Sequence, residues 1–144
     1  MVGPEDPRGA EALALMEELD ADLRARYPGQ AIHPAAPGEL SVFLVARLDG
    51  RPAGCGALRL LGEQGEVVRM YVRPGFRRRG VARAVLRGLE AAAREAGLRS
   101  LHLETGDNQA EAVALYRSEG FVPTGPYGPL ASCPHSLFFR KALE

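Results

Sequence analysis

The segment from Glu66 to Ala82 constrains the fold of this chain more than any other part of the sequence. A strand-like run ends at Pro74-Gly75, a basic loop follows, and a helical pattern begins near Gly80. A helix N-terminus presents unpaired N–H groups and about half a unit of positive charge, so it favours an anion, above all a phosphate. The small residues at 80 and 82 let a bulky ligand approach the backbone. The segment therefore predicts a pyrophosphate site, and the alternative is a plain solvated basic loop.

The rest of the chain alternates between helical and strand-like patterns. The predicted helices cover residues 8–27, 80–96 and 107–119, and the predicted strands cover residues 41–48, 52–61, 66–73, 98–104, 121–122 and 136–141. No internal repeat or linker interrupts this order. It predicts one α/β (α+β) domain over residues 1–144, in which a mixed central β-sheet carries helices on both faces.

Composition narrows the class of partner. The 144 residues fit a single domain, and the 18 basic and 18 acidic residues cancel, which argues against a nucleic-acid partner. The two cysteines show no metal-ligand spacing, so no metal is expected. The sequence shows no signal peptide and no run of about 20 apolar residues. We therefore expect a cytoplasmic protein without a membrane partner. The sequence leaves open whether the protein forms a homodimer.

Two motifs resemble those of a known family. The run Arg77-x-x-Gly80-x-Ala82 resembles motif A of the GNAT superfamily of N-acetyltransferases, Q/R-x-x-G-x-G/A, and it follows a strand that ends in Met70-Tyr71-Val72. The segment 103–121, from Leu-Glu-Thr-Gly to the closing Gly-Phe, resembles motif B. Because the motifs are linked at the proper separation and the element order matches, the chain is similar to small bacterial GNAT proteins of unassigned substrate.

The resemblance implies the GNAT fold and an acetyl-CoA co-substrate. It also implies transfer of the acetyl group to a primary amine of a small molecule or protein, by direct attack in a ternary complex. Amides of the loop would hold the CoA pyrophosphate, and strand backbone would bind the pantetheine arm as though it were another strand. The residues so assigned to the cofactor are Met70, Tyr71, Val72, Arg77, Arg78, Arg79, Gly80, Val81, Ala82, Arg83, Asn108, Gln109 and Tyr116.

The sequence departs from the family pattern in two places. Only residues 1–7 precede the first helix, so the usual first strand is expected to be short or missing. Motif B normally carries an asparagine seven residues before its tyrosine, and Gln109 stands there instead, directly after Asn108. Asn108 has a second interpretation as a helix N-cap, with Glu111 completing a capping box.

The implied reaction needs a base for the incoming ammonium, stabilisation of an oxyanion and a proton for the leaving thiolate. Tyr116 resembles the motif B tyrosine beside the acyl sulfur, and its phenol can donate that proton. Its position also fits a core aromatic, because it continues the apolar face of its helix.

Glu66 is the candidate base. Strand alternation predicts Glu66 on the same face as Met70 and Val72, and this spacing resembles that of the general-base glutamate in histone acetyltransferases. The alternative is an ion pair across to Arg59. Glu104, at the end of the next strand, is a second candidate that would act through water.

Acceptor specificity is expected from the first helix, residues 28–38 and residues 123–135. Two other function classes stay in view. The first is a non-catalytic acyl-CoA-binding regulatory module, against which the presence of both Tyr116 and Glu66 argues. The second is a nucleic-acid-binding domain that uses the arginine cluster at 77–79, against which the zero net charge argues.

Overall fold

The computed structural model describes residues 1–144 apart from 31, 33, 129 and 144. Its elements in chain order are β1 (Val2–Pro4), α1 (Ala10–Arg26), the 3-10 turn η1 (Pro37–Glu39), β2 (Val42–Leu48), β3 (Arg51–Leu61), β4 (Gln64–Val72), the 3-10 turn η2 (Pro74–Phe76), α2 (Val81–Glu95), β5 (Ser100–Gly106), α3 (Ala110–Ser118), β6 (Val122–Pro123) and β7 (Ser136–Ala142). Each helix and strand expected from the sequence is present, with ends that differ by a few residues. The first strand, expected to be short or missing, is a short β1 that pairs with β2. Across the described residues, no helix combines the length and apolar character that crossing a membrane requires.

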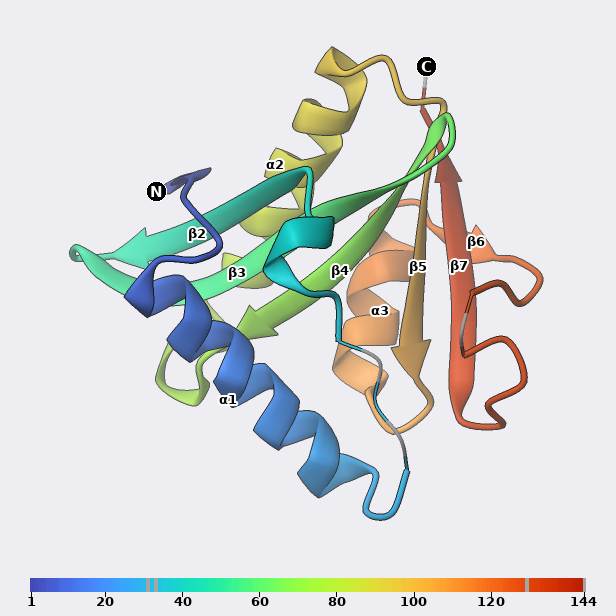
Figure 1. Ribbon diagram of the computed structural model, residues 1–144, viewed down its shortest axis with the longest axis horizontal. Helices are drawn as coiled ribbons and strands as arrows, with labels where there is room; N and C mark the ends of the chain where they lie inside the picture. The colour runs from blue at the N-terminus through green and yellow to red at the C-terminus, as the bar shows by residue number, and fades with distance from the viewer. Residues whose placement is uncertain (31, 33, 129, 144) are drawn as a thin grey trace.

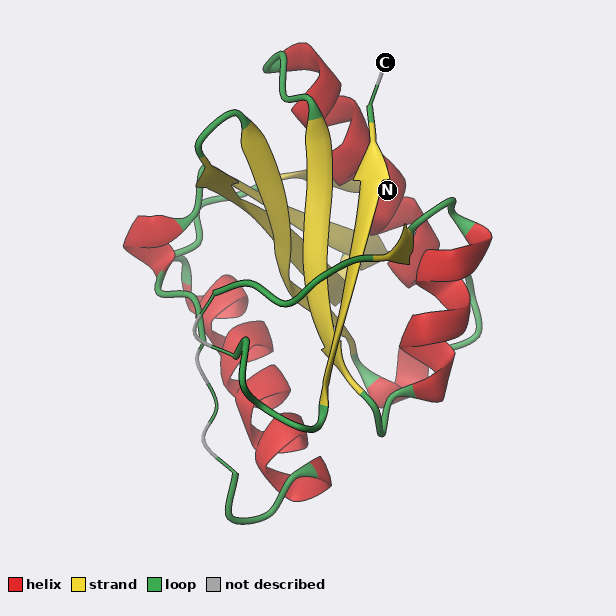
Figure 2. Ribbon diagram, turned by 90° about the vertical axis from the view of Figure 1, so that its right-hand side faces the viewer, coloured by secondary structure: helices red, strands yellow, loops and turns green. Residues whose placement is uncertain are grey.

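The strands form one seven-stranded sheet in the order β1-β2-β3-β4-β5-β7-β6. Only β4 and β5 run parallel, and the other neighbours are antiparallel. Helix α1 covers one face, whereas α2 and α3 cover the other (Figures 1 and 2). The predicted mixed sheet with helices on both faces is confirmed.

Strand alternation supplies both layers of the core. In β2, Phe43 and Val45 pack under α1, while Leu44 and Ala46 face α2. Helix α2 contributes one continuous apolar face, on which Val85, Leu86 and Leu89 are fully buried. Full burial of such a side chain stabilises the fold by about 1.5–3 kcal/mol. Both faces of the central strands are therefore buried, and the sheet is a rigid platform.

The parallel strands β4 and β5 are paired over only a short part of their length. Strands β4 and β5 pair only over Gly65–Val67 and Leu101–Leu103, and both strands then continue without pairing to each other. Figure 1 shows them separating toward their C-terminal ends. The backbone edges that face the gap therefore have no strand partner, which leaves room for a ligand inside the sheet.

A β-bulge lies in β4 beside this separation. Arg69 has a φ of +59°, and the register with β3 shifts between Cys55 and Ala57. Beyond the bulge, Met70 and Val72 pack on the α2 side of the sheet. The predicted common face for Glu66, Met70 and Val72 is therefore wrong, because the extra residue of the bulge reverses the alternation after position 68.

Candidate active site

The loop before α2 is a cradle of unpaired backbone amides. Arg78 and Gly80 have φ values of +63° and +76°, and Gly80 is the N-cap of α2. Among the described residues, no group accepts a hydrogen bond from the amides of residues 78–83. A Cβ at Gly80 would meet open space. Such a run of free N–H groups at a helix N-terminus binds anions.

Two arginines of this loop use their side chains to brace it. Arg77 Nε donates to the carbonyl of Val72 at 2.9 Å, and its guanidinium lies 6.0 Å from the centre of the Tyr71 ring. The Arg79 guanidinium lies 6.0 Å from the centre of the Phe76 ring. These contacts hold the loop against the end of β4.

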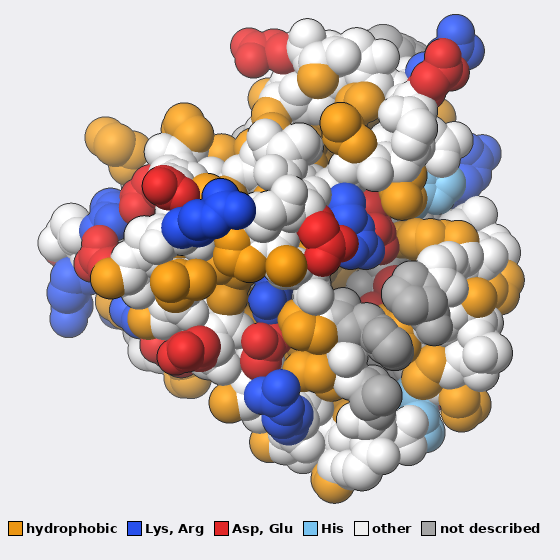
Figure 3. All heavy atoms as spheres, in the orientation of Figure 1, with side chains coloured by type: hydrophobic (Ala, Val, Ile, Leu, Met, Phe, Trp, Pro, Cys, Tyr) orange, Lys and Arg blue, Asp and Glu red, His pale blue; other side chains and the backbone are white. Residues whose placement is uncertain are grey.

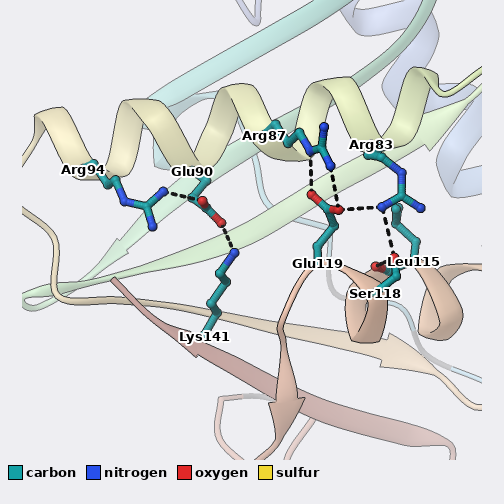
Figure 4. Close-up of polar contacts among 8 residues, drawn as sticks. All are labelled: Arg83, Arg87, Glu90, Arg94, Leu115, Ser118, Glu119 and Lys141. Carbon is teal, nitrogen blue, oxygen red and sulfur yellow. Dashed lines mark hydrogen bonds and ion pairs between the residues drawn. The ribbon is translucent and has the colours of Figure 1, made fainter. Parts of the chain in front are cut away.

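Two carboxylates tie α2 to the C-terminal part of the chain (Figure 4). Glu119, directly after α3, accepts hydrogen bonds from Arg83 Nη1 at 2.5 Å and Arg87 Nε at 2.9 Å. The hydrogen bond from Arg87 is the largest influence that lowers the pKa of Glu119 below its ordinary value. Glu90 of α2 binds Lys141 of β7 at 2.5 Å. The guanidinium of Arg83 is therefore engaged, and its assignment to the cofactor rests on its amide.

A cavity of about 190 Å³ opens where β4 and β5 separate. Its walls come from α1, the described residues of the segment after it (Gln30, Ile32, Pro34 and Ala35), the β4 bulge, the end of β5, α3 and the loop before β7. Figure 3 shows this face of the molecule, on which acidic and basic side chains are interspersed with apolar ones. Residues 28–38 and 123–135, expected to set acceptor specificity, both contribute to the walls.

Glu66 lines the cavity but is engaged in an ion pair. Its Oε1 accepts from Arg59 Nη2 at 2.6 Å and Nε at 2.9 Å, and only 7% of the residue is exposed. Arg59 also donates to Glu39 at 3.0 Å. The pairing with Arg59 that the sequence offered as an alternative is therefore present, and the charge of Glu66 is compensated.

Glu104 lines the same cavity without a basic partner among the described residues. Its Oε2 accepts a hydrogen bond from Ser136 Oγ at 2.7 Å. Burial raises the pKa of Glu104 above its ordinary value of 4.5, and the nearby Glu66 carboxylate raises it further. Asp20, the third carboxylate on the described walls, pairs with Arg69 at 2.6 Å. Among the described residues that line the cavity, Glu104 is thus the carboxylate that forms no ion pair with an arginine or lysine.

Tyr116 is a core aromatic, as one interpretation of its sequence position predicted, and its role as a proton donor stays a prediction. It is 6% exposed, and its ring centre lies 5.9 Å from that of Phe121 in the core. The residue also lines the cavity. Burial, and to a lesser degree Glu104, raise the pKa of its phenol above the ordinary value of 10.0. The phenol therefore keeps its proton at neutral pH.

The N-terminus of α3 differs from the expected capping box. The N-cap is Gln109, and no side chain caps the helix. The predicted cap by Asn108 with Glu111 is therefore wrong. Asn108 instead donates its backbone N–H to the Tyr27 hydroxyl at 2.9 Å. Gln109 Oε1 accepts from the N–H of Gly106 at 3.0 Å, which orders the turn after β5.

Comparison with known protein families shows which family this chain belongs to. The model of the acetyltransferase (GNAT) family matches residues 12–121. This chain belongs to the GNAT acetyltransferase family. It is 42% identical to an IAA acetyltransferase of Azospirillum brasilense, over 99% of this chain and 97% of that protein. It is 31% identical to an uncharacterised N-acetyltransferase of Bacillus subtilis, over 96% and 97% of the two chains.

Solved structures agree with the fold. A candidate acyl-CoA N-acyltransferase of Klebsiella pneumoniae superimposes with a TM-score of 0.86 at 33% identity, over 100% of this chain and 97% of that one. The PaiA N-acetyltransferase of Thermoplasma acidophilum, solved with coenzyme A, is 15% identical with a TM-score of 0.73 over 99% of both chains, which shows the fold alone. The expected GNAT fold and acetyl-CoA-dependent N-acetyltransferase class are confirmed at the level of the family.

Sequence reasoning gave Tyr127 no role in this GNAT cavity. Tyr127 lies in the connection between β6 and β7 and lines the cavity together with Glu66 and Glu104. Its ring centre lies 5.7 Å from that of His102 and 5.2 Å from that of Phe138. The only signal was an aromatic residue within a Pro/Gly-rich connection, because the contacts that place it are distant in sequence.

Proposed function

We propose that this GNAT protein binds acetyl-CoA across the separation of β4 and β5 and transfers the acetyl group to a primary amine in the cavity. One observation carries the proposal. The cradle of unpaired amides at residues 78–83 lies at the end of β4, and the cavity with Glu104 and Tyr116 lies beside the same strand. The unpaired edge of β4 thus runs from the phosphate site to the site for proton transfer.

The pyrophosphate would bind the loop amides, since they are free and converge at a helix N-terminus. The pantetheine arm would bind β4. The Arg73 N–H donates to β3, and Tyr71 pairs with that strand. Alternation therefore directs the backbone groups of Met70 and Val72 to the opposite edge, where β5 leaves them unpaired. The carbonyl of Val72 is already occupied by Arg77, so its N–H and the Met70 backbone would serve the arm.

Proton transfer would involve Glu104 and Tyr116. The ammonium loses a proton to Glu104, directly or through water, and the neutral nitrogen attacks the thioester carbonyl. The tetrahedral intermediate then expels the thiolate, and the Tyr116 hydroxyl gives its proton to the sulfur. The nitrogen, which became cationic on attack, loses its second proton through water to the Tyr116 phenolate, and the proton held by Glu104 is released to solvent. We propose Glu104 as the base in preference to Glu66. Burial brings the pKa of Glu104 closer to neutral, whereas Arg59 occupies the Glu66 carboxylate.

Titration calorimetry with acetyl-CoA tests the cofactor part of the proposal. The wild-type protein is expected to bind, and Gly80→Val is expected to lose binding because its side chain fills the space in front of the amides. Valine at a φ of +76° adds backbone strain of about 1–2 kcal/mol, which a domain can tolerate. Gly75→Ala, in the same loop without a positive φ, is the control and should bind normally.

A thiol-release assay with a panel of primary amines tests turnover. Absence of acetyl-CoA binding at high micromolar concentration would overturn the proposal as a whole. Binding without acetyl transfer to any amine would favour the regulatory module over the enzyme.

A further inference from the structure

The Tyr127 hydroxyl has no partner among the described residues. In that part of the chain, it is the one buried side-chain nitrogen or oxygen without a hydrogen bond. Two other tyrosine hydroxyls beside α1 are occupied, because that of Tyr27 accepts from the Asn108 amide and that of Tyr71 contacts Glu18 at 3.4 Å. A buried hydroxyl without a partner destabilises a fold, so its presence needs a reason.

Packing fixes where this hydroxyl lies. The Tyr127 ring meets the rings of His102 and Phe138 edge-on, on β5 and β7. His102 is the register partner of Glu66, and Glu104 follows two residues later on the same face of β5. The Tyr127 residue therefore lies at the cavity wall that carries both carboxylates. Burial, and after it the neighbouring Glu66 carboxylate, raise the pKa of the Tyr127 phenol, so Glu66 lies close to the hydroxyl, although the two form no hydrogen bond of standard geometry.

The charges on the described walls favour a cation that carries no carboxylate. Arg59 and Arg69 both line the cavity, and each already forms an ion pair with a wall carboxylate. They leave the negative charge of Glu104 unbalanced. The remaining wall includes the apolar side chains of Leu19, Leu23, Ile32, Val68 and Leu130. An acceptor with a positive end and an apolar body complements this surface, whereas an amino acid would bring a carboxylate without a free cation to meet it.

We propose that Tyr127 determines acceptor specificity: its oxygen accepts a hydrogen bond from the ammonium of the acceptor, beside the charge of Glu104. The acceptor class is then a small primary alkylamine or arylalkylamine without a carboxylate. This inference rests on the proposed acetyl transfer. It explains why the hydroxyl is buried without a partner among the described residues, because the ligand supplies the missing N–H.

The test compares Tyr127→Phe with the wild-type protein at saturating acetyl-CoA. The acceptors are phenethylamine, hexylamine and phenylalanine, the last being phenethylamine with an added carboxylate. Wild-type kcat/KM is expected to be at least about 10-fold higher for the best amine than for phenylalanine. In Tyr127→Phe, the KM for that amine should rise about 10- to 100-fold, the range for one hydrogen bond to a charged group. The Kd for acetyl-CoA should stay unchanged.

A stability measurement separates this role from a structural one. Tyr127→Phe keeps the ring and removes an unpaired buried hydroxyl, so the Tm should stay the same or rise. Tyr27→Phe is the matched change at the same cavity. It removes a bonded hydroxyl, so its Tm should fall while the KM for the amine changes less.

Three outcomes would overturn the inference while acetyl transfer itself stands. They are an unchanged KM in Tyr127→Phe, whatever its Tm, a rise in KM of the same size in Tyr27→Phe, or a wild-type preference for phenylalanine over both amines. Failure of the wild-type protein to bind acetyl-CoA, or to acetylate any amine in the wider panel, would instead refute the proposed function.

Discussion

Replacing Glu104 by glutamine separates the two candidate bases. In Glu104→Gln, the side chain keeps its size and an oxygen for the Ser136 hydroxyl, but it cannot accept a proton. The rate of acetyl transfer near neutral pH is expected to fall by about 10²-fold or more, the usual range for a lost general base. The loss should shrink toward pH 10, because alkylamines with a pKa near 10 are then largely neutral and need no base.

The stability of Glu104→Gln should change in the opposite sense to its rate. Burial raises the pKa of Glu104 above 4.5, so in this pH range the folded state binds a proton more tightly than the unfolded state. Stability from this group is therefore greatest below pH 4.5 and is lost as the pH rises through the folded pKa. The variant escapes that loss, and its Tm at pH 7 should equal or exceed that of the wild-type protein.

Glu66→Gln should show the reverse pattern. The substitution breaks an ion pair whose carboxylate side chain is 9% exposed and whose Arg59 side chain is 22% exposed. Full loss of a buried partner costs about 3–5 kcal/mol. Arg59 keeps its bond to Glu39 and reaches solvent, and glutamine keeps an acceptor, so we expect about 1–3 kcal/mol. In a domain of this size, the Tm falls by roughly 3–10 °C.

Steady-state rates between pH 6 and 10 and thermal denaturation at pH 7 check both variants. The expected result is a slow, stable Glu104→Gln and a less stable Glu66→Gln whose pH profile keeps its wild-type shape. A Glu104→Gln variant with a wild-type rate and a Glu66→Gln variant with a flattened acid limb would refute the reasoning from the ion pairs and would make Glu66 the base.

Three further predictions concern neighbouring groups. Tyr116→Phe should lower kcat by about 10²-fold with little change in the Kd for acetyl-CoA, and an unchanged kcat would leave water as the proton donor. Gly106→Ala would drive its Cβ into the Tyr27 hydroxyl, so urea denaturation should show a loss of about 1–3 kcal/mol, which Tyr27→Ala should partly restore. Glu119→Gln should weaken binding of acetyl-CoA more than that of acetyl-pantetheine, because its arginine contacts lie on the helix that begins at the pyrophosphate cradle; equal losses would contradict this.

The sequence could predict features whose causes are local. Pro74-Gly75 ends β4, and Gly80 supplies the left-handed N-cap of α2, so the loop and its free amides followed from a short segment. The pair of Arg59 and Glu66 was also within reach, because both residues lie on one antiparallel hairpin and face each other in register.

Features that depend on distant contacts were not predictable in this way. Arg69 adopts a positive φ without a glycine, stabilised by Asp20 of α1 and the Ala35 carbonyl, and this bulge overturned the predicted face of β4. Asn108 carried a local capping signal, yet the Tyr27 hydroxyl from the end of α1 determines its role. In both cases tertiary hydrogen bonds outweighed the local preference.

The gap between β4 and β5 bears on the solubility of the protein as well as on its chemistry. Two strands in the middle of the sheet leave backbone without a strand partner, and such backbone at the edge of a sheet invites pairing with another chain and aggregation. A cofactor arm that hydrogen-bonds to β4 would cover part of that edge, and at 100 times its Kd it would stabilise the folded state by about 2.7 kcal/mol. Occupancy of the cofactor site would thus stabilise the folded state and cover backbone that otherwise has no strand partner.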